Sequence, residues 1–245
     1  MSTAKQFIDE IAQSKLGVAI DIYKNTAKRS HDGYLNAEVF QRMRDGKNDD
    51  AVRRFFAGPF AQVRIWLPEM FGLYISRFPD HTYTYVVADN LSDEYGKYLG
   101  HKDIKPSHAQ LYRRVLNELK IPVVENTMST PVKRSSQAAT SFYDWFKKRT
   151  MTESPEYMIG HFLAYEITDV LDFPDYLVAA LRLWPEKSNV HEFFTQHAES
   201  GHDAAFARDL ENFFEQNRQR MIEGMGNLLE QWTIFYHRAS EEVGA

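Results

Sequence analysis

The chain contains no cysteine among its 245 residues. That absence excludes disulfide bonds, thiolate metal sites and cysteine nucleophiles. Neither sign of charge dominates, since the chain has 29 Lys and Arg residues and 34 Asp and Glu residues, for a formal net charge of −5. No basic stripe alternates with aromatic side chains, so the sequence predicts no nucleic-acid partner.

Long apolar runs are missing as well. None approaches the roughly 20 residues that a membrane-spanning helix needs, so we expect no membrane partner. Residues 1–15 include Lys5, Asp9, Glu10 and Lys15, and they lack the apolar core of a secretory signal peptide. A cytoplasmic protein is therefore expected. The sequence also lacks a glycine-rich phosphate loop and a Gly-x-Ser-x-Gly elbow, which gives kinase and serine-hydrolase activities no support.

What the chain does contain is a large apolar fraction with helical spacing. Hydrophobic residues make up 43% of the sequence, including 17 Phe, 13 Tyr and 4 Trp, which is enough for a sizeable core. The apolar residues recur with the period of an α-helix almost throughout, and β-strand signals are few. We predict an all-α fold, a single helical bundle domain over residues 1–245.

Caps and prolines give approximate bounds for the predicted helices. The predicted helices cover residues 3–23, 49–70, 79–96, 108–119, 131–150, 154–171 and 173–184. A further helix begins near residue 188, and the last helical pattern ends near residue 239. Pro59 and Pro68 are expected to kink or split the second of these. A loop is expected over residues 96–107.

Two glutamates fall on apolar helix stripes. Glu166 shares a face with Ile159, Phe162 and Leu163, and Glu94 shares one with Val87 and Leu91. An unpaired buried charge costs several kcal/mol or more, so each carboxylate needs a partner.

Two histidines occupy equivalent places in other helices. His197 follows Val190, Phe193 and Phe194 on one face, and His108 leads the stripe of the helix that Ser107 caps. Facing helices of a bundle can supply such oxygen and nitrogen ligands to iron or manganese. Each residue also has a structural interpretation: His108 as a capping or hydrogen-bonded core histidine, His197 bonded to a backbone carbonyl or to Glu166, and Glu94 paired with an arginine.

Five short stretches give the chain a family resemblance. They are Ala88–Gly96, Ser107–Tyr112, Ile159–Glu166, Glu192–His197 and the aromatic Leu229–Tyr236. With these motifs, residues 50–240 resemble the heme-oxygenase-like metal-dependent oxidases. That group is similar in fold to the thiaminase-like TenA proteins and to the PQQ-synthesis oxidase PqqC.

The resemblance implies a set of iron ligands and a reaction class. The metal ligands would be Glu94, His108, Glu166 and His197, with the two glutamates also counted as catalytic residues. His101 competes with His108 for the first imidazole. The implied cofactors are one or two Fe(II) ions, with O2 as co-substrate. Enzymes of this kind are oxidases or oxygenases of small molecules such as amino acids or fatty acids.

The sequence departs from the family pattern after His197. The family motif continues with an Asp and a His that complete a second iron site, and the corresponding residues here are Gly201 and Ala204. Glu199 and His202 keep a Glu-x-x-His spacing two residues out of register. On an uninterrupted helix they would lie on a solvated face, whereas a break near Gly201 would let them turn inward. The neighbours His161 and Tyr165 are candidates to hydrogen-bond the ligands.

Three hypotheses about function follow. The first is an O2-dependent non-heme iron oxidase or oxygenase with a small-molecule substrate, in natural-product biosynthesis or related metabolism. The second is a metal-free enzyme that resembles PqqC or TenA, with a carboxylate and imidazoles as general acid and base. The third is a non-catalytic helical protein that binds an apolar ligand. The sequence leaves a homodimer open.

Overall fold

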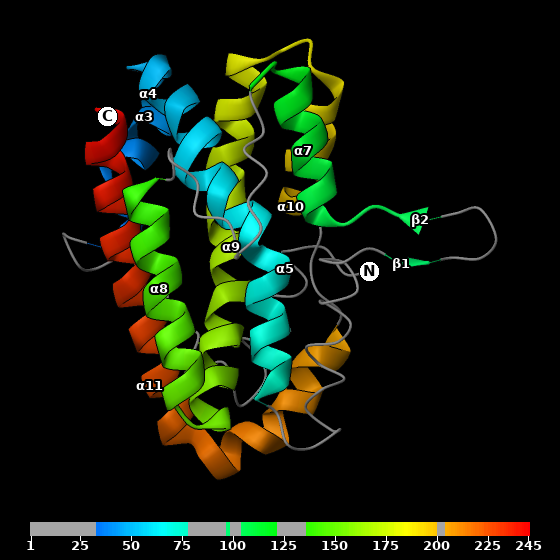
Figure 1. Ribbon diagram of the computed structural model, residues 1–245, viewed down its shortest axis with the longest axis vertical. Coiled ribbons are helices and arrows are strands. Elements are labelled where there is room, and N and C mark those ends of the chain that lie inside the picture. The colour runs from blue at the N-terminus through cyan, green and yellow to red at the C-terminus, as the bar shows by residue number, and fades with distance from the viewer. Residues whose placement is uncertain (1–32, 78–96, 99–103, 122–135, 200–203) are drawn as a thin grey trace.

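The computed structural model describes residues 33–77, 97–98, 104–121, 136–199 and 204–245 (Figure 1). The predicted all-α fold is confirmed, with one short β pair added. The helical elements are η1 (Tyr34–Asn36), α3 (Glu38–Asp45), α4 (Asp49–Phe55), η2 (Phe56–Phe60), α5 (Ala61–Ser76), α7 (His108–Glu118), α8 (Gln137–Thr152), α9 (Pro155–Leu183), α10 (Ser188–Glu199) and α11 (Ala204–Val243).

Two short strands lie in the segment that the sequence predicts to be a loop. β1 (Lys97–Tyr98) pairs antiparallel with β2 (Ile104–Lys105), and Tyr98 is opposite Ile104. Ser107 then ends the segment as the N-cap of α7.

The first long helical segment contains two prolines, and one of them changes the helical geometry. Residues 49–76 form α4, the π-helical turn η2 and α5, and Pro59 lies within η2. Because proline has no backbone N–H and its ring clashes with the preceding turn, a wider turn accommodates it. Pro68 lies inside α5, which continues through it. The predicted split is therefore found at Pro59 only.

Helix α9 is longer than the sequence predicts. Ser154 caps it by accepting a hydrogen bond from the Tyr157 backbone N–H, and Pro155 takes the first helical position, as expected. The predicted break near residue 172 is wrong, since α9 continues through Pro174 to Leu183. Phe173 and Tyr176 are both buried on either side of Pro174. Their packing compensates a proline penalty of about 3 kcal/mol.

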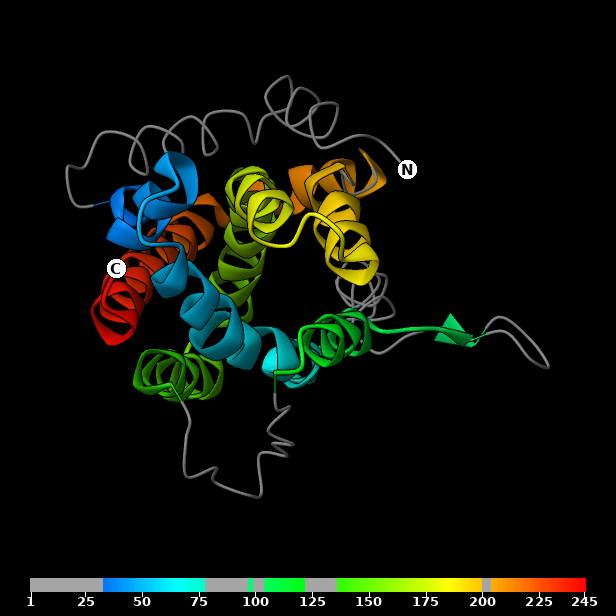
Figure 2. The ribbon, with the colours of Figure 1, turned by 90° about the horizontal axis from the view of Figure 1, so that it is seen from above.

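The long helices α9 and α11 cross at two glycines. A Cβ atom on Gly160 would lie 2.1 Å from the backbone oxygen of Met221, and one on Gly224 would lie 2.0 Å from the oxygen of Tyr157. The two backbones therefore approach so closely that only glycine fits at either position. Figure 2 shows α9 between the C-terminal half of α11 with α8 on one side, and α10 with α7 on the other.

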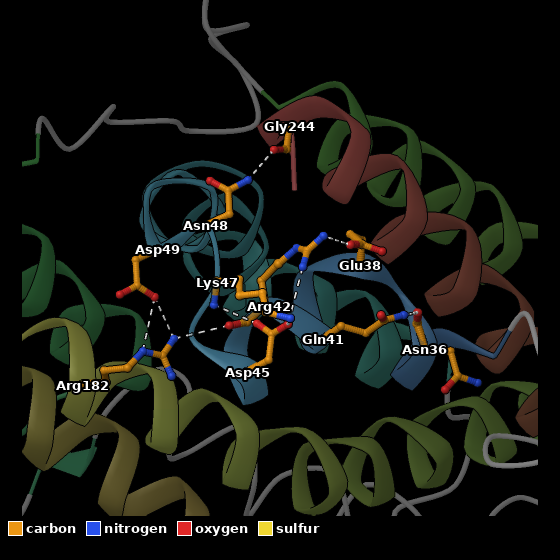
Figure 3. A network of polar contacts seen from close by, with 10 residues as sticks. All are labelled: Asn36, Glu38, Gln41, Arg42, Asp45, Lys47, Asn48, Asp49, Arg182 and Gly244. Carbon is orange, nitrogen blue, oxygen red and sulfur yellow. Dashed lines mark hydrogen bonds and ion pairs between the residues drawn. The ribbon is translucent and has the colours of Figure 1, made fainter.

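Polar contacts tie the end of α9 to the corner between α3 and α4 (Figure 3). The Arg182 side chain donates to the Asp49 carboxylate at 2.9 Å and to the Met43 carbonyl oxygen at 2.8 Å. Asn48 in turn donates to the Gly244 carbonyl oxygen at 2.8 Å, at the C-terminal end of α11. Distant segments of the chain are thereby fastened together at this end of the bundle.

A buried carboxyl lies between α9 and α11. Asp172 accepts a hydrogen bond of 3.0 Å from the Tyr236 hydroxyl, and the hydroxyls of Tyr176 and Tyr236 are 2.6 Å apart. Burial raises the pKa of Asp172 well above its usual range, and nearby Asp169 adds to the effect.

Among the helices of the described residues, none combines the length and the apolar composition that a membrane span requires.

Candidate metal centre

His108 is the first residue of α7, and its position follows from local sequence. Ser107 accepts a hydrogen bond from the Gln110 backbone N–H, and the Gln110 side chain accepts one from the Ser107 N–H. This reciprocal capping box satisfies backbone donors that the helix itself leaves unpaired. Ser107 rather than His108 therefore caps the helix. The His108 side chain is half-buried.

His197 is held near the end of α10. Its Nδ1 atom lies 2.7 Å from the carbonyl oxygen of Phe193, one turn earlier in the helix. Since a carbonyl oxygen only accepts, Nδ1 carries the proton and the lone pair is on Nε2. Backbone bonds of this kind fix the tautomer and orientation of metal-binding imidazoles. The sequence alone leaves open whether His197 bonds a backbone carbonyl. The structure shows this bond, and it is compatible with metal binding.

The two imidazoles meet across separate helices. The ring centroids of His108 and His197 are 4.4 Å apart, with an angle of 60° between the ring planes. The His197 ring also stacks on Phe173, at 4.6 Å and 16°. A pair of imidazoles in an aromatic surrounding brings together nitrogen ligands that iron accepts.

Glu166 occupies the interior of α9 with only 3% of its surface exposed. Its helix neighbours Phe162 and Leu163 are fully buried, as the apolar stripe predicts. Phe173 follows seven residues later, which places it within about 20° of Glu166 around the helix and about 10 Å along it. Phe173 contacts His197 of α10, so the same face of α9 carries Glu166 and, about two turns later, the contact with the imidazole.

These residues suit an iron ion in chemical terms. Two imidazoles supply neutral nitrogen ligands, and a buried carboxylate supplies an oxygen ligand and offsets positive charge. The described residues contain no group of three or more His, Asp or Glu side chains arranged to hold a metal.

Of the predicted site residues, Glu94, His101 and His202 lie outside the described ranges, as does Gly201. Glu199 ends α10, and its side chain is not described.

Tyr165, the neighbour of Glu166, belongs to a buried ion-pair cluster. Its hydroxyl accepts a hydrogen bond of 3.0 Å from Arg64 of α5. Arg64 also donates to both oxygens of Asp169, at 2.8 and 3.0 Å, and its guanidinium carbon lies 4.8 Å from the centre of the Phe173 ring. The sequence does not single out Asp169 or Phe173. The feature of the sequence that could have identified them is their spacing of three and seven residues after Glu166 in the helical pattern.

His161 lies on a different side of α9 from Glu166. Five residues separate them, which corresponds to about 140° around the helix. The Nδ1 atom of His161 is hydrogen-bonded to the Tyr74 hydroxyl, and its ring lies 5.1 Å from that of Trp145. Burial lowers the pKa of His161 to about 3. Burial raises the pKa of Tyr74 well above its usual range, and nearby Glu166 adds to the effect.

Comparison with known proteins places this arrangement in context. In solved structures, the chain is similar to a CADD-like protein of unknown function from Nostoc punctiforme PCC 73102, with a TM-score of 0.71, 13% identity, and coverage of 94% of this chain and 98% of that one. It is also similar to a TenA family transcription regulator from Silicibacter sp. TM1040, with a TM-score of 0.57, 12% identity, and the same coverage. These likenesses concern the fold alone.

Sequence comparison adds the family. No curated protein matches the chain. The family model described as iron-containing redox enzyme matches residues 54–232, which include α9, α10 and every candidate metal ligand. The predicted resemblance to the heme-oxygenase-like group is thereby confirmed. The chain belongs to this family of iron-containing redox enzymes.

Proposed function

We propose that the protein is an O2-dependent non-heme iron oxidase or oxygenase that acts on a small molecule. The observation that carries the proposal is the contact between the His108 and His197 imidazoles, at 4.4 Å, beside the helix that buries Glu166. Membership in a family of iron-containing redox enzymes supports the same chemistry. Imidazole and carboxylate ligands are those that non-heme iron uses.

The iron would be held by His108, His197, Glu166 and Glu94. When bound, Fe(II) supplies the site for O2 reduction, which organic side chains alone do not provide. His197 would bind through Nε2, since its Nδ1–H donates to the Phe193 carbonyl oxygen. The Glu166 carboxylate would offset the charge of the ion in an interior that excludes water.

The aromatic surroundings favour a small, partly apolar substrate. Phe173 and Phe193 both lie against His197 and are almost completely buried. Two arginines of the described helices are engaged elsewhere: Arg64 with Asp169, and Arg182 with Asp49. We therefore do not assign them to a substrate carboxylate, and we expect recognition to rest largely on apolar contact.

Anaerobic titration with Fe(II) tests the proposal. We expect the wild-type chain to bind one or two equivalents, and Glu166→Ala to weaken binding by at least about tenfold, because the site loses a charged ligand in a dry interior. Glu230→Ala, at an exposed position on α11, is the matched control and should leave the dissociation constant unchanged.

The outcomes separate the hypotheses. Fe(II) binding that needs Glu166, followed by O2 consumption, supports an iron oxidase or oxygenase. No bound Fe(II) in the wild type, together with no effect of Glu166→Ala, would contradict it. A metal-free enzyme or a non-catalytic ligand-binding protein on the same fold would then be the better interpretation.

A further inference from the structure

A single aromatic ring joins the buried ion pair of α5 and α9 to the imidazole on α10. Phe173 is fully buried, and its ring stacks on His197 at 4.6 Å with only 16° between the planes. The guanidinium carbon of Arg64 lies 4.8 Å from the centre of the same ring. The consecutive helices α9 and α10 and the distant helix α5 therefore meet at Phe173.

Arg64 is itself held firmly. Its side chain is 6% exposed and forms a two-pronged ion pair with Asp169, while the Tyr165 hydroxyl accepts a further bond. Cation–π contacts strengthen when both groups are desolvated, and a bidentate ion pair fixes the plane of the guanidinium. Arg64 therefore restricts where the Phe173 ring can lie.

Several neighbours restrain the rotation of the His197 ring, among them the rings of Phe193 and His108, each at 4.4 Å between centroids. The hydrogen bond from Nδ1 to the Phe193 carbonyl oxygen fixes one edge of the imidazole but permits tilting about that bond. Stacking on Phe173 limits the tilt, because a flat ring against a flat ring leaves no room for rotation without loss of contact. The direction of Nε2 thus depends on the backbone hydrogen bond and on these ring contacts, of which the Phe173 stack is the most nearly parallel, at 16° against 41° for Phe193 and 60° for His108.

We propose that Phe173, held in place by Arg64, is a positioning residue that aims His197 at the metal. This inference rests on the iron site proposed above. It assigns to an apolar side chain the function that second-layer hydrogen-bonding groups usually have around metal ligands. It also explains why a buried ion pair lies so close to the site at Asp169, next to Glu166 in the helix.

The test compares Phe173→Leu with Phe146→Leu. Both phenylalanines are fully buried, but Phe146 contacts Tyr74 and His161 rather than either candidate imidazole ligand. We expect Phe173→Leu to weaken Fe(II) binding by about 10- to 100-fold in anaerobic titration, which is the range for second-layer substitutions. Phe146→Leu should leave the dissociation constant unchanged. Equal effects of the two substitutions would overturn the proposal.

A second measurement on the metal-free protein separates this proposal from the proposed function. The NMR signals of the His197 ring, identified by their loss in His197→Gln, should be shifted upfield in the wild type by the stacked ring. Phe173→Leu should remove that shift, and Phe146→Leu should keep it. If the wild type binds no Fe(II), the iron site is wrong, while this result still decides whether the Phe173 ring stacks on His197.

Folding is checked by circular dichroism for each variant. Should Phe173→Leu fail to fold, Phe173→Met replaces it, because an unbranched thioether adapts to the space of a ring. An unchanged His197 signal in a folded Phe173 variant would overturn the positioning function, whatever the Fe(II) affinity.

Discussion

At the scale of single residues, His161 illustrates what burial does to a titratable group. Its ring lies among Tyr74, Trp145 and Phe146, and its Nε2 atom has no hydrogen-bond partner among the described residues. Burial lowers its pKa to about 3, and Arg149 adds to the effect. The imidazole is therefore neutral in the folded protein throughout the neutral range.

This depressed pKa predicts a loss of stability in acid. Between the unfolded pKa of about 6.5 and the folded pKa of about 3, the imidazole of the unfolded chain binds a proton that the folded protein does not bind. The contribution of His161 to the free energy of unfolding is therefore fully present above about pH 6.5 and decreases as the pH falls. The contribution of His161 to the free energy of unfolding should fall by about 2 kcal/mol between pH 7.5 and pH 5. Urea denaturation at both pH values measures it.

His161→Gln should remove this part of the pH dependence. The difference between wild type and variant isolates His161, because Asp172 titrates in both proteins. Burial raises the pKa of Asp172, so its own contribution has the opposite sign and is lost as the pH rises. Parallel pH profiles for wild type and variant would contradict the assignment of a neutral buried imidazole.

At the scale of helices, the crossing of α9 and α11 depends on Gly160. A Cβ atom there would come within 2.1 Å of the Met221 backbone oxygen, a distance that requires the helices to separate. We expect Gly160→Ala to reduce the free energy of unfolding by about 3 kcal/mol or more, in the range of severe overpacking.

Gly226→Ala is the matched control on α11. A Cβ atom at Gly226 meets nothing within 4 Å, so alanine should be neutral or stabilising by up to about 1 kcal/mol through its helix propensity. Chemical denaturation of both variants provides the measurement. Similar stabilities for the two alanine variants would show that the crossing is not limited by the Gly160 contact.

At the scale of the whole molecule, a metal between helices should couple iron binding to stability. The candidate ligands within the described residues, His108, Glu166 and His197, lie on α7, α9 and α10. A ligand that binds only the folded state stabilises it by about 2.7 kcal/mol at a concentration of 100 times its dissociation constant.

We therefore expect anaerobic Fe(II) to raise the melting temperature by several degrees, as a stabilisation of that size does for a domain of this length. A chelator should reverse the shift, and Glu166→Ala should reduce it. An equal shift in the wild type and in Glu166→Ala would indicate that Fe(II) binds elsewhere on the protein.

The sequence alone was sufficient for the fold class and for the burial of particular side chains. Helical periodicity predicted the all-α fold, and the stripe of Ile159, Phe162 and Leu163 predicted correctly that Glu166 is buried. Ser107 and Ser154 cap the helices as expected. These features are local, because caps and stripes depend on residues a few positions apart. The metal ligand set and the single domain over residues 1–245 stay predictions.

Only the tertiary structure decided which side chains meet. The continuation of α9 through Pro174 depends on packing around Phe173 and Tyr176, which outweighs the local cost of proline. The contact of His108 with His197 joins α7 to α10, and the contact of Arg64 with Phe173 joins α5 to α9, and both are pairs of helices far apart along the chain. Periodicity tells which side of a helix is buried, but the neighbouring helix and its rotation are set by the close packing of the whole core.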